Sequence, residues 1–249
     1  MRKFLLNTVA TLNTIVLATL VTLSLAGSLT STVQADSTAR VDNNIYLTSP
    51  EGEQLFRDAE ILTDYLKLAS YLESEHILTF CGPASIAGVM NSLDIERPQP
   101  PELYPWPLFT QVSIFTPENQ KVKSYAMVEH EGLELPQLAQ FFINLGAKAE
   151  FKHADDFDEN WLRETITKTL ADPNKRFVAN YSRKPIGQVG GGHISPVAAY
   201  DADTDRVLVM DVARYKYPPV WLTIAELYGA MMDKDSTSNR ARGAVIVSQ

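Results

Sequence analysis

Cysteine is nearly absent from this chain, because Cys81 is the only one in 249 residues. A lone thiol cannot close an internal disulfide, and it cannot supply the four Cys or Cys/His ligands of a structural zinc site. An internal disulfide and a structural zinc site of that type are therefore excluded. Cys81 is either a small buried side chain, as most free cysteines are, or a reactive group.

Basic charge is also scarce: 22 Lys and Arg residues face 30 Asp and Glu residues, which leaves a net charge of −8. The chain has no basic stripe, internal repeat or low-complexity tract. An acidic protein without a basic patch is a poor partner for nucleic acid or for an anionic membrane surface. We therefore expect no nucleic acid and, in the mature protein, no membrane among its partners.

The one long apolar stretch lies near the N-terminus, at about residues 15–26, and Thr and Ser residues break it. Arg2 and Lys3 precede it, and Val33-Gln34-Ala35 follows as a small-x-Ala cleavage site. This order predicts a secretory signal peptide at residues 1–35 and a periplasmic or secreted protein. The alternative, an uncleaved membrane anchor, is disfavoured by the short, interrupted run.

After cleavage, we expect polar residues 36–48 to form a loose lead-in and residues 49–249 to form one domain. Helical periodicity predicts helices that start after Ser49 and that cover about residues 81–93, 135–145 and 158–170. Short apolar runs predict strands at residues 176–181, 193–200, 206–212 and 244–248. Helices in the first half and an antiparallel sheet in the second make an α+β fold.

Cys81 opens the predicted helix that runs to about residue 93. Unpaired N–H groups and the positive end of the helix dipole favour a thiolate at such a position. A thiol nucleophile needs a base, and the base needs a partner that orients it. His193 follows a run of three glycines at the start of a predicted strand, and Asp211 lies near the end of the next one. A hairpin that turns at residues 203–205 would bring His193 and Asp211 together.

Several sequence blocks resemble the catalytic domains of the phytochelatin synthase family, over about residues 49–249. The matching blocks are Phe80-Cys81-Gly82-Pro83-Ala84-Ser85, Asn180-Tyr181-Ser182-Arg183-Lys184, Gly187-Gln188-Val189-Gly190-Gly191-Gly192-His193-Ile194-Ser195-Pro196, Asp211-Val212-Ala213-Arg214-Tyr215-Lys216-Tyr217-Pro218-Pro219-Val220-Trp221 and Arg242-Gly243. The resemblance implies a papain-like two-lobed fold. It also implies that Cys81 is the acylated nucleophile, His193 the general acid–base and Asp211 the residue that orients it.

The reaction implied by the resemblance is the cleavage of glutathione at its cysteinyl–glycine amide. A γ-glutamylcysteinyl thioester forms on Cys81 and passes to water, to a second glutathione or to a longer γ-Glu-Cys peptide. The resemblance implies no cofactor and no built-in metal site, because a divalent metal such as Cd²⁺ or Zn²⁺ acts largely through the thiolates of the substrate. The sequence does not give the oligomeric state, and a homodimer is one option.

Substrate-binding candidates follow from the two charges on the γ-glutamyl end of glutathione. An Arg near the pocket would pair with its carboxylate, and an Asp would pair with its ammonium. Asp235 and Arg242 resemble the family's pair of that kind. Arg183 lies just ahead of the glycine run and is a further candidate. Gly191, within that run, would let a substrate backbone approach closely.

One residue departs from the family pattern. Family members usually have a Gln six residues before the nucleophile, where its amide donates to the oxyanion, but this chain has Glu75 there. An ionised carboxylate would repel an oxyanion, whereas a protonated Glu75 could donate if burial raised its pKa. The backbone N–H of Cys81 would be a donor in either case.

Two alternatives to a glutathione-cleaving transferase stay open at this point. The first is a papain-like peptidase that acts on other peptides, which an Asp235–Arg242 pair that binds the γ-glutamyl end would disfavour. The second is a non-catalytic protein that binds thiols or metal–peptide complexes, with Glu75 as the sign of lost catalysis. A thioester on Cys81 would exclude the second alternative.

Overall fold

The structure is a computed structural model that describes residues 43–249. The expected signal peptide and residues 36–42 of the expected lead-in lie outside the described residues. Two residues that we expected in the lead-in, Ile45 and Tyr46, form strand β1 and pair with residues 220–221 at the edge of the sheet. Within residues 43–249, no helix combines the length and the apolar character needed to cross a bilayer.

The described residues form eight α-helices and one seven-stranded antiparallel sheet. The helices are α1 (Pro50–Asp58), α2 (Thr63–Ala69), α3 (Cys81–Ser92), α4 (Pro117–Val122), α5 (Tyr125–Glu131), α6 (Leu135–Asn144), α7 (Glu159–Leu170) and α8 (Ile224–Met232). The strands are β1 (Ile45–Tyr46), β2 (Lys148–His153), β3 (Lys175–Ser182), β4 (Gly192–Asp201), β5 (Arg206–Val209), β6 (Val220–Thr223) and β7 (Gly243–Ser248). The α+β prediction is confirmed.

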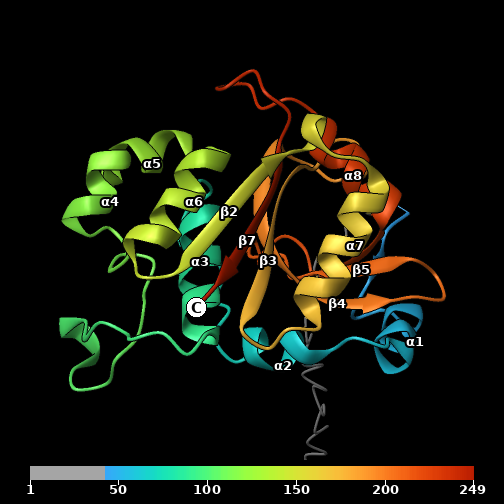
Figure 1. Ribbon diagram of the computed structural model, residues 1–249, viewed down its shortest axis with the longest axis horizontal. Coiled ribbons are helices and arrows are strands. Elements are labelled where there is room, and N and C mark those ends of the chain that lie inside the picture. The colour runs from blue at the N-terminus through green and yellow to red at the C-terminus, as the bar shows by residue number, and fades with distance from the viewer. Residues whose placement is uncertain (1–42) are drawn as a thin grey trace, which may run out of the picture. The chain divides into compact units, whose positions relative to one another are not determined.

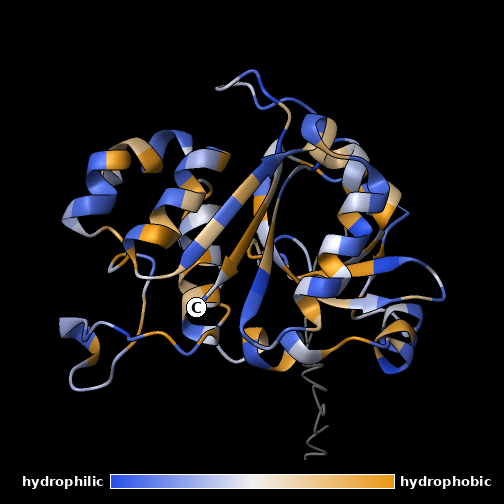
Figure 2. Ribbon diagram, in the orientation of Figure 1, coloured by the Kyte–Doolittle hydropathy of each residue, from blue (hydrophilic) through white to orange (hydrophobic). Residues whose placement is uncertain are grey.

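The sheet has the strand order β1-β6-β5-β4-β3-β7-β2, and helices cover both of its faces (Figure 1). Alternate residues of β3 point to opposite sides, so that Val178 packs in the core that contains α3 and α6. Phe177 and Ala179 pack in the other core, beneath α7 and α8. Hydrophobic residues colour most of β7, whereas α7 carries both hydrophobic and hydrophilic stretches (Figure 2). The sheet is therefore the shared middle layer of the fold.

A buried ion pair joins helix α2 to strand β3 of the sheet. The Arg176 side chain on β3 is fully buried, and its Nη1 lies 3.0 Å from Oδ1 of Asp64 on α2. Arg176 also donates to the side chain and the carbonyl of Ser92 at the end of α3. Burial raises the pKa of Asp64 to about 7, against the attraction of Arg176. Desolvation therefore outweighs the attraction between the two charges at this position.

Most of the elements expected from the sequence are present with small shifts at their ends. Ser49 caps α1, and Asp158 caps α7 by accepting from the backbone N–H of Trp161. The expected strand at residues 206–212 ends at Val209, so Asp211 lies just beyond β5. The elements that were not predicted from the sequence are strands β1, β2 and β6 and helices α2, α4, α5 and α8.

Candidate active site

Helix α3 points its first residue at the start of strand β4. Cys81 is that first residue and is buried. One turn later, the hydroxyl of Ser85 donates to the backbone carbonyl of Ile194 on β4, over 3.0 Å. Gly82 in the first turn lets α3 pack closely, because a Cβ there would lie 2.9 Å from a Leu133 methyl group. These contacts hold the thiol next to the residues that begin β4.

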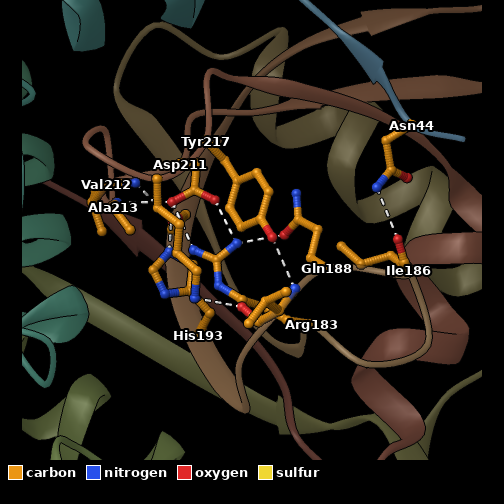
Figure 3. A network of polar contacts seen from close by, with 12 residues as sticks. Asn44, Arg183, Ile186, Gln188, His193, Asp211, Val212, Ala213 and Tyr217 are labelled. Atoms are coloured by element: carbon orange, nitrogen blue, oxygen red, sulfur yellow. Dashed lines mark hydrogen bonds and ion pairs between the residues drawn. The ribbon is translucent and has the colours of Figure 1, made fainter. Parts of the chain in front are cut away.

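His193 and Asp211 come together across the hairpin formed by β4 and β5 (Figure 3). Nε2 of His193 lies 2.9 Å from Oδ1 of Asp211. The same carboxylate oxygen accepts the backbone N–H of Ala213 over 2.8 Å. The predicted hairpin and the predicted contact between the two side chains are present. Because Asp211 occupies Nε2, Nδ1 is the ring nitrogen left to serve the thiol.

Arg183 is a second hydrogen-bond partner of the Asp211 carboxylate. Its guanidinium donates to both carboxylate oxygens, over 2.7 and 2.9 Å, and it also donates to the side chain of Gln188. The ring of Tyr217 lies beneath it, with its centroid 5.0 Å from the guanidinium carbon. Figure 3 shows this network beside the imidazole. Only 3% of Arg183 is exposed, so its charge faces Asp211, although the sequence suggested a substrate contact.

The electrostatics of the site favour a neutral thiol beside a neutral imidazole. Burial, and then the charge of Glu75, raises the pKa of Cys81 to about 12. Burial also lowers the pKa of His193, more than Asp211 raises it. Burial alone would raise the pKa of Asp211, but His193 and Arg183 hold it well below its usual range. The dipole of α3 favours a thiolate at this position, whereas desolvation favours the neutral thiol.

A cavity of about 170 Å³ opens beside the thiol and the imidazole. Cys81 and His193 line it together with Asp235 and Arg242, so the structure brings four of the predicted site residues to one pocket. Nη1 of Arg242 lies 2.7 Å from Oδ2 of Asp235. The Nε atom of Arg242 is buried and has no hydrogen-bond partner among the described residues. The pocket thus offers both signs of charge and one unused donor.

Sequence reasoning missed Asn180 as part of this pocket. Asn180 lies on β3, lines the cavity, and has a buried Oδ1 without a hydrogen-bond partner in the described part of the chain. Its place at the start of one of the family-like blocks was the available signal. A buried amide oxygen that faces a cavity can accept from a ligand N–H.

The three glycines at the start of β4, Gly190, Gly191 and Gly192, have different surroundings. Gly190 has a φ of 126°, which side-chain residues rarely adopt. A Cβ on Gly192 would lie 2.4 Å from Nη1 of Arg242, so this glycine makes room for the guanidinium. Gly191, the predicted substrate contact, is exposed and has no atom within 4 Å of an added Cβ. Its carbonyl accepts the backbone N–H of Arg183.

Glu75 lies close to both reactive groups, as its position in the sequence suggested. One carboxylate oxygen of Glu75, the thiol sulfur and a ring nitrogen of His193 all lie within 4.8 Å of one another. The hydroxyl of Tyr215 donates to Oε1 of Glu75 over 2.6 Å, and Oε2 is buried without a partner among residues 43–249. Burial raises the pKa of Glu75. Sequence reasoning did not identify Tyr215 as its partner.

Comparison with known proteins identifies the relatives of this chain. A family model described as phytochelatin synthase matches residues 37–244. The chain is 31% identical over 209 residues to glutathione gamma-glutamylcysteinyltransferase 1 of Triticum aestivum, covering 82% of this chain and 40% of the relative. It is 30% identical over 208 residues to glutathione gamma-glutamylcysteinyltransferase 2 of Arabidopsis thaliana, covering 82% and 45%. The Schizosaccharomyces pombe enzyme of the same name is 26% identical over 188 residues, covering 75% and 44%. The chain thus spans less than half the length of these curated relatives.

Proposed function

The chain belongs to the phytochelatin synthase family, and from that premise we propose that it cleaves glutathione through a thioester on Cys81. The observation that most directly supports this proposal is that Cys81 and His193 line one cavity with the Asp235–Arg242 ion pair. The curated relatives are named for transfer of a γ-glutamylcysteinyl group from glutathione. A nucleophile, a base and a charged pair in one pocket suit that substrate.

In the proposed mechanism, the thiol gives its proton to Nδ1 of His193 as sulfur attacks the cysteinyl carbonyl. The amide bond breaks, and His193 returns the proton to the departing glycine amine. The γ-glutamylcysteinyl group stays on Cys81 as a thioester. Water, or the α-amine of a second glutathione, then attacks the thioester while His193 takes the proton of the attacking group. The proton returns to the sulfur, and the thiol is restored.

Asp211 and Arg183 support this proton transfer without contacting the substrate. Asp211 holds the imidazole by Nε2, so Nδ1 is the nitrogen that accepts the thiol proton. The two hydrogen bonds from Arg183 fix the carboxylate and keep it ionised. An ionised Asp211 stabilises the imidazolium that forms during attack. We therefore assign Arg183 as a positioning residue in place of the substrate contact that the sequence suggested.

Asp235 and Arg242 are the proposed site for the γ-glutamyl end. Its carboxylate would accept from Arg242, whose Nε has no partner in the described chain. Its ammonium would donate to Asp235, which already carries negative charge next to the cavity. Charge-assisted hydrogen bonds of this kind are about twice as strong as neutral ones. The zwitterionic end would thus insert into an existing ion pair.

We further propose that the domain has the papain-like two-lobed arrangement, with the nucleophile at the start of the central helix α3. The antiparallel sheet that carries His193 supports this assignment. Export after cleavage of residues 1–35 is also a proposal, which rests on the charged start and the apolar run. N-terminal sequencing of the protein recovered from outside the cytoplasm would test the cleavage site.

The proposed function is tested by intact-mass and product analysis of the mature, reduced protein with glutathione. We expect a γ-glutamylcysteinyl adduct on Cys81, equimolar glycine in the first turnover, and neither in Cys81→Ser. The ratio of γ-glutamylcysteine to longer peptides separates hydrolysis from transfer. A reduced wild-type protein that gives no adduct and no glycine would refute the proposal and favour a binding protein.

A papain-like peptidase with another substrate is distinguished by a matched pair of tripeptides. Glutathione and its α-linked isomer have the same atoms but place the carboxylate and ammonium differently. We expect cleavage of glutathione at a higher kcat/KM than of the α-linked isomer, because only the γ-linked end carries the ammonium and the carboxylate on one carbon atom, which suits the adjacent charges of Asp235 and Arg242. Equal or reversed values would favour the general peptidase.

A further inference from the structure

Three buried side chains in the pocket have the donor atoms of a metal site. Glu75, Cys81 and His193 each offer one ligand atom, and the three atoms lie within 4.8 Å of one another. They come from the loop before α3, the first turn of α3 and the start of β4. The fold therefore holds the three donors in place from separate elements, although they are distant in sequence.

The donor types select a class of cation. A thiolate, an imidazole and a carboxylate suit borderline-soft divalent ions such as Zn²⁺ and Cd²⁺. Three protein ligands with a fourth position open to water is a common arrangement for zinc. Mg²⁺ and Ca²⁺ prefer six or more oxygen ligands, and this set offers one carboxylate. The site therefore favours the softer ions.

Two of the three ligands already have an outer partner. Tyr215 donates to Oε1 of Glu75, and Asp211 holds Nε2 of His193. Such outer hydrogen bonds orient metal ligands, and the contact with Asp211 also raises the basicity of His193. Oε2 of Glu75 is buried with no hydrogen-bond partner among the described residues, and only 6% of the residue is exposed. A buried oxygen without a partner is costly, and a cation would satisfy it.

Charge balance also favours a divalent ion at this position. A dication with one thiolate, one carboxylate and one neutral imidazole is neutral overall. Metal binding displaces the thiol proton, which passes to solvent. A glutamine in place of Glu75 would leave one positive charge unbalanced in a buried pocket. Glu75 is thus the residue that makes the set complete.

We propose that Glu75, Cys81 and His193 bind one Zn²⁺ or Cd²⁺ ion and that this ion blocks the nucleophile. Binding requires only the three ligands, whereas the inhibition rests on the proposed cleavage of glutathione. The metal acts here on the free enzyme, in addition to any metal carried by substrate thiolates. Free metal ions would therefore lower glycine release, and excess glutathione would restore it by removing the metal.

The metal site is tested by titrating the mature, reduced protein with CdCl₂ in the absence of glutathione. The readout is the ultraviolet charge-transfer absorption of a thiolate bound to cadmium, which requires no enzymatic activity. We expect saturation at one equivalent, loss of the band in Cys81→Ser, and an affinity more than about 100-fold weaker in Glu75→Gln. Absence of the band in reduced wild-type protein would overturn the proposal.

The matched control is Glu73→Gln, which removes the same charge two residues away. Glu73 is exposed and lies 3.9 Å from His76, outside the pocket. We expect its cadmium affinity to equal that of the wild type. An equal loss in Glu73→Gln and Glu75→Gln would show a general charge effect and overturn the assignment of Glu75 as a ligand. The assignment would also be overturned if Glu75→Gln bound cadmium as tightly as the wild type.

A second readout covers the case in which Glu75→Gln is poorly folded. ZnCl₂ should slow the alkylation of Cys81 by iodoacetamide in the wild type, and a chelator should restore the rate. Zinc that leaves the alkylation rate unchanged would overturn the proposal. Glycine release from glutathione by the metal-free protein is measured separately, so failure of the metal site and failure of the proposed function give different results.

Discussion

The charge of Glu75 acts on the pKa of Cys81 at close range. The negative charge of Glu75 is the second cause, after burial, of the raised pKa of the thiol. Burial in turn raises the pKa of Glu75, so the carboxyl group retains its proton to a higher pH than an exposed glutamate. A protonated Glu75 can donate to an oxyanion, whereas the ionised form repels it. The protonation state of Glu75 therefore determines whether it helps or hinders acylation.

Glu75→Gln should raise the acylation rate, and the gain should grow with pH. The amide keeps a donor beside the oxyanion and removes a charge that becomes more populated as pH rises through the raised pKa of Glu75. In other enzymes, removal of one oxyanion donor lowers kcat by about 10²–10³-fold. Single-turnover glycine release at several pH values measures the effect. A slower or unchanged variant would show that Glu75 is not the oxyanion residue.

Glu75→Gln should also stabilise the protein at neutral pH and not in acid. Because burial raises the folded-state pKa of Glu75, its contribution to stability is present below the unfolded-state pKa. That contribution is lost as pH rises through the folded-state pKa, and the glutamine variant does not lose it. Urea unfolding near pH 4 and near pH 7 measures the difference. A stability gain that is larger in acid would contradict this sign.

Asp211→Asn should damage both activity and stability. The change favours the wrong tautomer of His193 and removes the charge that stabilises its imidazolium, and a comparable change in a serine protease lowers kcat by about 10⁴. It also leaves Arg183 buried beside a neutral partner, and breaking a buried ion pair costs about 3–5 kcal/mol. Glycine release and urea unfolding test the two effects. Asp203→Asn, at the exposed turn of the same hairpin, is the control and should change neither.

At the scale of elements, periodicity predicted α3, α6, α7 and the strands that carry the site, because each has a clear apolar pattern. Strand β2 was missed because it is an edge strand whose side chains are mostly exposed, which weakens the alternation. Strand β6 has four residues and follows two prolines, so it gives little signal. Helix α8 is a short apolar run, which periodicity alone does not separate from a buried strand.

The candidate site was predictable where element ends coincide with reactive side chains. Cys81, His193 and Asp211 each lie at the end of a helix or strand, and their meeting follows from the packing of α3 on β4 and from one hairpin. The role of Arg183 was not predictable, because a sequence does not show which acidic side chain a buried arginine pairs with. The raised pKa of Cys81 depends on burial, which a helix-end position does not reveal.

Gly192→Ala, at the first residue of β4, should weaken glutathione binding. The added Cβ would displace Nη1 of Arg242 and break its pairing with Asp235. We expect KM to rise roughly tenfold, the equivalent of about one charged hydrogen bond. The neighbouring change Gly191→Ala meets no atom within 4 Å and should leave KM unchanged to within about twofold. A larger effect at Gly191 would restore it as a substrate contact.

At the scale of the whole molecule, the Asp64–Arg176 pair joins the helical layer to the sheet. Each single change, Asp64→Leu or Arg176→Met, should cost about 3–5 kcal/mol, because it leaves the other charge buried and unpaired. The double variant should regain most of this loss, because burial already outweighs attraction in the wild type. A double-mutant cycle by urea unfolding measures the coupling. Additive losses would contradict this interpretation.

Strand β7 closes the described chain in sequence but lies inside the sheet, between β3 and β2. Arg242, which lines the pocket, directly precedes it. The middle of the sheet and part of the pocket are therefore completed by the same few residues. Strand β7 pairs with β3 and β2, which lie far from it in sequence, and pairing over such distances is slow. Completion of the pocket is thus tied to a late step in the folding of the sheet.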